Sequence, residues 1–248
     1  MTKAITIDFW NTLVDASGGE ARDSCRRNSL RNAMLHVGRE ISDAEISSAF
    51  DKVHERFEHV WKNDRRTLTT DEMVSTMWIH FGVEIPPEQH ASVVRDFERS
   101  ILFGQPKLLA GAKESLAILS RKYVLALISD TAFSPGYVLT ELLEGYGVRK
   151  YFSAFSFSDE TGCSKPDARA FRTVLDQLHV SAVEAIHVGD IERTDIAGAK
   201  ALAMKAILFR GDTQSLYHSD DYHNTQADAV ANSWSEVPGI IERMEHGD

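Results

Sequence analysis

Five residues whose side chains could do chemistry are spread along the chain: Asp8, Ser129, Lys165, Asp190 and Asp195. A carboxylate such as Asp8 can attack an electrophile and form a covalent intermediate. A serine hydroxyl can donate a hydrogen bond to an anionic oxygen, and a lysine can neutralise its charge. Asp190 and Asp195, together with Asp8, would make a set of hard oxygen ligands suited to Mg²⁺. Whether these groups act together depends on the elements that position them.

The first of these residues follows a short apolar segment. Ile5 and Ile7 alternate with Thr6, and Asp8 ends the run, which is typical of a buried strand with a carboxylate at its C-terminal end. In an open parallel sheet, ligands bind just beyond the carboxyl ends of the strands. Taken alone, Asp8 fits a strand cap or the start of a turn as well as a catalytic carboxylate.

The second half of the chain alternates apolar runs with helical periodicity. Strands are predicted at residues 124–128, 151–157, 185–188 and 206–209, with a short edge strand at 229–230. Helices are predicted at 109–122, 134–143, 166–178, 196–204 and 237–244, and polar loops at 158–165 and 218–228. Repeated strand–helix units imply an α/β fold with a parallel, right-handed, doubly wound sheet. Ser129, Lys165 and Asp190 then fall at strand ends or in the loops that follow them.

The segment 16–104 contains no convincing strand and carries about four helical patterns. Ser42 with Glu45 forms a capping-box signature, Thr70 opens a third helix that ends near Gly82, and Pro86 precedes a fourth. We therefore predict a helical bundle inserted after the first strand. The core domain would comprise residues 1–15 and 105–248, and the inserted domain residues 16–104.

Composition narrows the classes of partner. The 248 residues are 43% hydrophobic and 26% charged, with a formal net charge of -10, which disfavours duplex nucleic acid but allows a small anion held by local donors and a metal. Cys25 and Cys163 are too few and too far apart for a disulfide framework or a zinc site. We expect neither a signal peptide nor a membrane helix, and a cytoplasmic monomer or homodimer.

Four motifs in order resemble those of the haloacid dehalogenase superfamily, in the group with a helical cap inserted after the first motif: DFWNTLVD, LISDT, SKPDARAF and VGDIERTDIAGAKALAM. The resemblance covers essentially the whole chain. It implies that Asp8 is the nucleophile and that Ser129 and Lys165 bind the phosphoryl group. It also implies that the backbone carbonyl of Trp10 binds the metal, with Asp8, Asp190 and Asp195, and that Thr12 helps to fix the motif. Asp195 could instead cap a helix.

The chain departs from this pattern at three positions. Phosphatase members place a second Asp two residues after the nucleophile, as acid and then base, whereas here that residue is Trp10. An indole N–H can donate a hydrogen bond but cannot exchange a proton near neutral pH. Asn11 replaces the usual Gly, which Asn tolerates because it accepts a left-handed conformation. Asp130 replaces a commoner Asn beside Ser129.

Four functions remain open on this evidence. The leading interpretation is a Mg²⁺-dependent phosphohydrolase or phosphotransferase acting on a small phosphorylated metabolite. A metal-independent 2-haloacid dehalogenase is the alternative, because those enzymes have an aromatic residue at the position of Trp10, although they usually lack the pattern of Asp190 and Asp195. A phosphonate hydrolase would need a cap lysine, for which Lys52 and Lys62 are nominal candidates. The fourth function, from a different class, is a weakly active binding or regulatory protein.

The inserted helices should supply specificity by closing over the strand ends and excluding water. Basic residues in the segment could meet a charged group of the substrate: Arg22, Arg26, Lys62, Arg65 and Arg66. For most of them a solvated helix face is the simpler interpretation. Arg22 and Arg26, with Thr12 and Asp130, are the predicted substrate-binding residues, and the expected partner is a small phosphorylated molecule rather than nucleic acid or a membrane.

Overall fold

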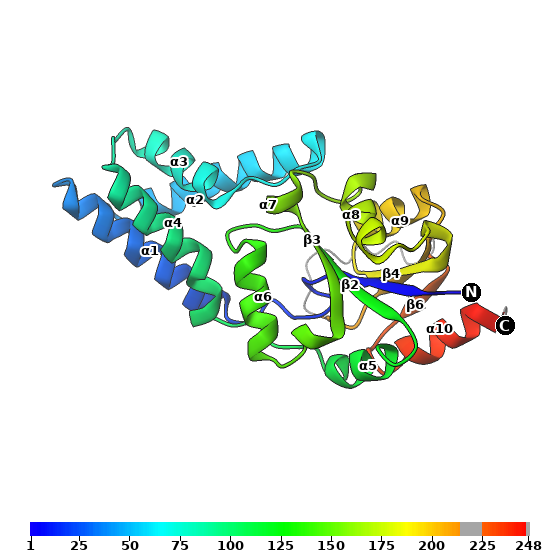
Figure 1. The fold of residues 1–248 in the computed structure, drawn as a ribbon. Coiled ribbons are helices and arrows are strands. Elements are labelled where there is room, and N and C mark those ends of the chain that lie inside the picture. The colour runs from blue at the N-terminus through cyan, green and yellow to red at the C-terminus, as the bar shows by residue number, and fades with distance from the viewer. Residues whose placement is uncertain (214–224, 247–248) are drawn as a thin grey trace.

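A computed structural model describes residues 1–213 and 225–246, and its centre is a parallel sheet of six strands (Figure 1). The strand order is β3-β2-β1-β4-β5-β6. The strands are β1 (Ala4–Ile7), β2 (Val124–Ser129), β3 (Phe152–Phe157), β4 (Ala185–Gly189), β5 (Lys205–Phe209) and β6 (Ala229–Ala231). The predicted α/β fold is confirmed, and the predicted edge strand is β6. Because the chain winds outward from β1 in both directions, the switch point of the sheet lies between β1 and β4.

Helices cover both faces of this sheet, as a doubly wound fold requires. They are α5 (Ala112–Leu119), α6 (Gly136–Gly145), α7 (Ser158–Thr161), α8 (Ala168–Leu178), α9 (Ala197–Ala201) and α10 (Val237–His246). One hydrophobic core joins the strands to α5, α6 and α10, and a second joins them to α8 and α9. All four residues of β1 are buried, so the strand that leads to Asp8 is fixed from both sides and both faces.

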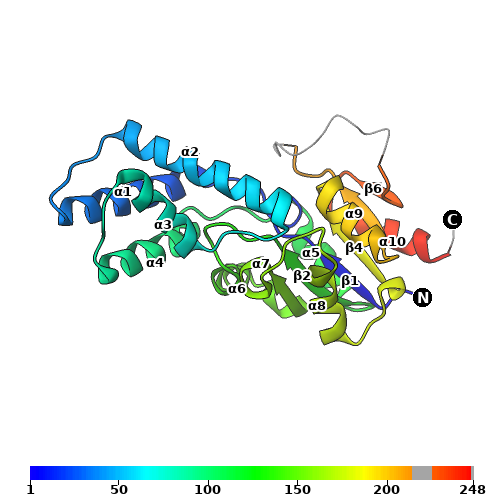
Figure 2. The same ribbon diagram turned by 90° about the horizontal axis from the view of Figure 1, so that it is seen from above.

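Four helices form an insertion between β1 and β2, which we call the helical insertion. They are α1 (Gly19–His36), α2 (Asp43–His59), α3 (Thr70–Phe81) and α4 (Pro87–Phe103), and they pack around a third hydrophobic core. Figures 1 and 2 show them gathered at one end of the molecule, on the side toward which β1 runs. The predicted Ser42–Glu45 capping box is present at α2, and α3 starts at the predicted Thr70, with Thr69 and Glu72 forming a second capping box.

The two connections to the helical insertion lie side by side. The backbone N–H of Asp15 donates to the carbonyl of Lys107 at 2.9 Å. Gly18 and Gly104 approach so closely that a Cβ on Gly104 would lie 2.2 Å from the Gly18 carbonyl oxygen. Gly18 also has a φ of 77°, a conformation that residues with a Cβ rarely adopt. The junction is therefore a close backbone contact that larger residues could not form.

Several predicted boundaries were wrong by a few residues, for local reasons. The helix predicted at 109–122 starts only after Gly111, and β3 starts at Phe152 because Arg149–Tyr151 form a 3₁₀ turn. The loop predicted at 158–165 contains the short helix α7, and a π-helical turn over Glu192–Ile196 precedes α9. Most of the loop predicted at 218–228 lies outside the described residues. Within the described residues, no helix is long and apolar enough to cross a membrane.

Candidate active site

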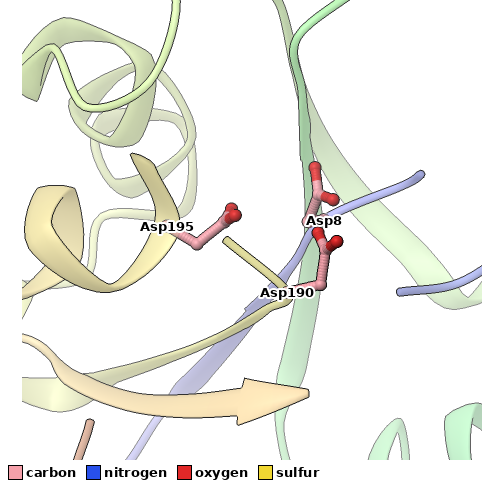
Figure 3. A group of neighbouring side chains, drawn as sticks. All are labelled: Asp8, Asp190 and Asp195. Carbon is pink, nitrogen blue, oxygen red and sulfur yellow. The ribbon is translucent and has the colours of Figure 1, made fainter. Parts of the chain in front are cut away.

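Three aspartates from two adjacent strand ends converge at the switch point of the sheet (Figure 3). Asp8 follows β1, Asp190 follows β4, and Asp195 lies in the π-helical turn beyond it. One oxygen from each carboxylate lies within 4.8 Å of the other two, and all three residues are buried. Gly189 permits this approach, because a Cβ there would lie 2.4 Å from Asp195 Cγ. The structure thus brings Asp8 together with Asp190 and Asp195, which lie far from it in the sequence.

Lys165 reaches into this cluster from the loop between α7 and α8. Its Nζ donates hydrogen bonds to Asp8 Oδ1 and, at 2.7 Å, to Asp195 Oδ1. The side chain is almost completely buried. Burial disfavours the ammonium, but Asp195 and Asp8 outweigh it and hold the pKa of Lys165 above its ordinary value. Lys165 therefore remains a cation that neutralises part of the charge of the cluster.

The carboxylates respond differently to this environment. Burial raises the pKa of Asp8 to about 7 against the opposing charge of Lys165, with Asp195 adding to the increase. Burial and then the charges of Asp8 and Asp195 raise the pKa of Asp190. One lysine thus does not balance three buried carboxylates. A divalent cation would relieve this excess of negative charge, and oxygen ligands from Asp8 and Asp190 are the kind it prefers.

Asp195 is held more tightly by protein groups than the other two aspartates. Besides Lys165, its carboxylate accepts hydrogen bonds from His187 Nε2 at 3.0 Å and from the backbone N–H of Ile191 at 3.0 Å. Burial raises its pKa, but Lys165 and His187 outweigh that effect, and the pKa lies below its ordinary value. The arrangement suits Asp195 first to orienting Lys165 and second to contacting a metal.

His187 is a site residue that the sequence analysis missed. Burial lowers its pKa, so the imidazole is neutral: Nε2 donates to Asp195, and Nδ1 pairs with the Thr6 hydroxyl at 2.8 Å. Thr6 and His187 face each other in the register of β1 and β4. Each of these two residues is a polar residue in an otherwise apolar strand, which indicates a special role. Their contact could be predicted only if the pairing of β1 with β4 were known.

Three predicted site residues lie around the cluster in different roles. Ser129 ends β2 with a buried hydroxyl that has no hydrogen-bond partner in the part of the chain that the structure describes, so it could bond a substrate oxygen. Thr12 is fully buried and its hydroxyl lies 3.5 Å from Asp190 Oδ1, so it supports that carboxylate rather than facing a substrate. Asp130 lines the cavity but accepts the backbone N–H of Lys165 at 3.0 Å.

A cavity of about 300 Å³ opens above the carboxylates. The helical insertion contributes Arg22, Phe57 and Trp61 to its wall, and Trp10 contributes from the turn after β1. Trp61 lies in a π-helical extension of α2, Val60–Asp64, and its Nε1 donates to Asp130 Oδ2 at 2.9 Å. Asn11, beside Trp10, has a φ of 54°, which confirms the left-handed conformation expected where the family has Gly. The sequence analysis did not identify Phe57 or Trp61 as site residues.

The basic residues of the helical insertion are mostly placed elsewhere. Arg22 lines the cavity, but its guanidinium donates to three backbone carbonyls, of Ala16, Ser17 and Gly104. Arg26 does not line it; its guanidinium bonds Ser100 Oγ and lies 4.4 Å from the centre of the Phe133 ring. The remaining candidates are not cavity residues: Lys52, Lys62, Arg65 and Arg66. Lys52, Lys62 and Arg66 form ion pairs with neighbouring glutamates.

Comparisons with known proteins agree with this geometry. A family model described as a haloacid dehalogenase-like hydrolase matches residues 2–202. The chain is 27% identical over 214 residues to a glyceraldehyde 3-phosphate phosphatase from Pyrococcus abyssi, covering 85% of this chain and 82% of that one. It is 28% identical to haloacid dehalogenase-like hydrolase domain-containing protein 3 of Mus musculus, with 69% of each chain covered.

Solved structures show the same fold across nearly the whole chain. A 2-haloacid dehalogenase from Pseudomonas syringae pv. Tomato superposes with a TM-score of 0.72 at 21% identity, covering 98% of this chain and 100% of that one. A phosphatase from Thermococcus onnurineus superposes with a TM-score of 0.66 at 19% identity, covering 97% and 98%. The fold, the matched family model and the cluster at the switch point lead to one conclusion: this chain belongs to the haloacid dehalogenase-like hydrolase family.

Proposed function

We propose that the protein is a Mg²⁺-dependent phosphohydrolase that acts on a small phosphorylated molecule through a phosphoaspartyl intermediate on Asp8. The observation that carries the proposal is the position of Asp190, buried beside Asp8 with a raised pKa. A second carboxylate there is costly unless a cation joins it. A metal-independent reaction at carbon, as in a dehalogenase, would not require this second carboxylate. The names of several relatives, including the Pyrococcus abyssi phosphatase, add support.

The residues of the site suit a two-step transfer. In the first step an Asp8 oxygen bonds to phosphorus, and the bond from phosphorus to the leaving oxygen breaks with its electron pair. In the second step water attacks phosphorus and the bond to Asp8 breaks, which frees phosphate and restores the carboxylate. A phosphotransferase would use an alcohol in place of that water.

Each neighbouring group has a role in these steps. Lys165 favours the anionic form of Asp8 and would face the negative phosphoryl oxygens, while Asp195, itself hydrogen-bonded to His187, holds Lys165 in place. The Ser129 hydroxyl supplies a hydrogen bond to one phosphoryl oxygen. Asp8, Asp190 and the carbonyl of Trp10 would hold Mg²⁺, which when bound neutralises the charge shared by the nucleophile and the phosphoryl group.

One observation favours a second candidate, a 2-haloacid dehalogenase. The side chain at position 10 is aromatic and lines the cavity, where phosphatases of the family carry a carboxylic acid. In that reaction Asp8 would bond to carbon and displace halide, and water would then cleave the ester at the Asp8 carboxyl carbon. No metal is required, so the two candidates differ in their response to a chelator.

The test measures phosphate release from acetyl phosphate and p-nitrophenyl phosphate in MgCl₂ and in EDTA. We expect Mg²⁺-dependent release that falls by roughly 10⁴-fold or more in Asp8→Asn, because the attacking charge is lost. Asp190→Ala should lose both activity and its Mg²⁺ dependence. Asp176→Asn, an exposed position on α8, is the matched control and should behave like the native protein. Circular dichroism checks that each variant is folded.

Two results would contradict the proposal. Turnover in a clean Asp8→Asn preparation would remove Asp8 as the nucleophile in either reaction. Chloride release from 2-chloropropionate in excess EDTA, without phosphate release from either ester, would establish the dehalogenase instead.

A further inference from the structure

The wall of the cavity beyond the carboxylates is aromatic. Three rings line it: Trp10 from the turn after β1, and Phe57 and Trp61 from α2 and its π-helical extension. The ring centroids of Phe57 and Trp61 lie 6.3 Å apart. Such a wall offers dispersion and ring contacts to whatever part of the substrate is not the phosphoryl group.

Two of these rings, Trp10 and Trp61, are held in place by contacts with neighbouring side chains. The guanidinium of Arg193 lies 3.8 Å from the centre of the Trp61 ring, and the Trp61 N–H is bonded to Asp130. Trp10 packs edge-to-face on the buried ring of Phe9, with centroids 5.1 Å apart. Fixed rings lose little freedom when a second flat surface joins them, so they are suited to binding a planar group.

Two charged side chains of the same wall, Arg22 and Asp130, already have hydrogen-bond partners within the protein. Arg22 uses its guanidinium on three backbone carbonyls, and Asp130 accepts hydrogen bonds from Trp61 and Lys165. A substrate rich in hydroxyls would lose hydrogen bonds to water on entering the cavity, and these groups already have other partners. Each hydroxyl left unpaired would lower the binding affinity. The volume of about 300 Å³ also limits the occupant to a small molecule.

We propose that the leaving group of the substrate is an uncharged aromatic or heteroaromatic ring that packs among Trp10, Phe57 and Trp61, so that the substrate class is a small aryl phosphate. This inference rests on the proposed phosphohydrolase function. When Asp8 bonds to phosphorus, the bond to the ring oxygen breaks and its electron pair stays on an aryloxide. An aryloxide is stable enough to leave without a proton, which accounts for an indole where a general acid would otherwise be needed.

The experiment separates the shape of the leaving group from its acidity. We compare kcat/KM in MgCl₂ for phenyl phosphate and for a fluorinated alkyl phosphate whose alcohol has the same pKa as phenol, with glyceraldehyde 3-phosphate as a polar substrate that has no ring. Phenyl phosphate should be preferred to both by at least ~10-fold, since several ring contacts contribute. Phe57→Leu keeps an apolar side chain but removes a ring, and should lower kcat/KM for phenyl phosphate alone, by roughly 2- to 12-fold.

Phe50→Leu is the matched control, because Phe50 is also a half-buried ring on α2 but does not line this cavity. It should leave the preference unchanged. Equal kcat/KM for phenyl and fluoroalkyl phosphate in the native protein would overturn the inference and leave the phosphohydrolase standing. Loss of activity on both esters in Phe57→Leu would also overturn it. Failure to release phosphate from any of the three would overturn the proposed function as well. The native comparison decides the question even where a variant does not fold.

Discussion

The hydrogen bond from Trp61 to Asp130 links the helical insertion to the loop that carries Lys165. Asp130 accepts a hydrogen bond from Trp61 Nε1 through Oδ2 and one from the backbone N–H of Lys165 through Oδ1, so one half-buried carboxylate bridges the two. Replacing Trp61 by Phe removes the donor but keeps a ring for the cavity and for Arg193. We expect Trp61→Phe to fold normally and to have a lower kcat/KM.

The magnitude depends on how far Asp130, which is half-buried at the cavity wall, is shielded from water. Leaving one oxygen of a buried polar group without its donor costs about 1–3 kcal/mol, which corresponds to a loss of roughly 5- to 150-fold. The lower end applies if water enters the space left by the indole. Other hydrogen bonds between the helical insertion and the core domain remain in the variant. They include Thr67 with Ser158 at 2.6 Å and the Ser164 N–H with the Arg65 carbonyl at 2.8 Å. The loss should therefore fall on catalysis rather than on folding.

Steady-state kinetics on phenyl phosphate, with thermal unfolding of each variant, measures this effect. Trp78→Phe is the matched control: Trp78 lies in α3, is as buried as Trp61, and also donates its indole N–H over 2.9 Å, but to His90 away from the cavity. It should leave kcat/KM unchanged. A Trp61→Phe protein within twofold of native kcat/KM, or an equal loss in both variants, would refute the coupling between Trp61 and the Lys165 loop.

Trp10→Asp should raise kcat/KM for alkyl phosphates, because a general acid typically contributes ~10²–10⁴-fold and matters most for poor leaving groups. A leaving-group series on native and variant protein tests this, and native activity on alkyl esters equal to that on aryl esters would contradict it. Mg²⁺ binding should release protons at about pH 6, and fewer at about pH 8, because burial raises the pKa of metal-free Asp8 to about 7 and ligands must be ionised. Calorimetry in two buffers of different ionisation heat measures the release; heats independent of buffer at about pH 6 would rule it out.

Much of the fold could be predicted from local patterns. Apolar runs predicted β2, β4 and β5 to within a residue or two, because each is buried on both faces and carries few polar residues. The Ser42–Glu45 capping box identified the start of α2 because both partners lie within one turn. Boundaries failed where a turn competes with the element, as it does ahead of α5.

The site could be predicted in part. Asp8, Lys165 and Asp190 follow strands whose ends meet in any parallel sheet, so their convergence could be inferred from the order of elements. The interactions of His187 and Trp61 depend on side-chain packing between segments distant in sequence, and no local pattern encodes it. Arg22 was instead predicted to bind substrate because of its charge. In the structure its guanidinium donates hydrogen bonds to backbone carbonyls at the Gly18–Gly104 contact.

The close contact of Gly18 with Gly104 bears on how the chain folds. β1 pairs with β2 across about 120 residues, from Ala4 to Val124, and most of them belong to the helical insertion. If the insertion folds first, its adjacent ends shorten the loop that remains to be closed to about 35 residues. The entropy of loop closure then falls by about 1 kcal/mol, and β1 finds its neighbours several times more often. In that order of folding, the segment that lines the active-site cavity would also speed assembly of the sheet that carries Asp8.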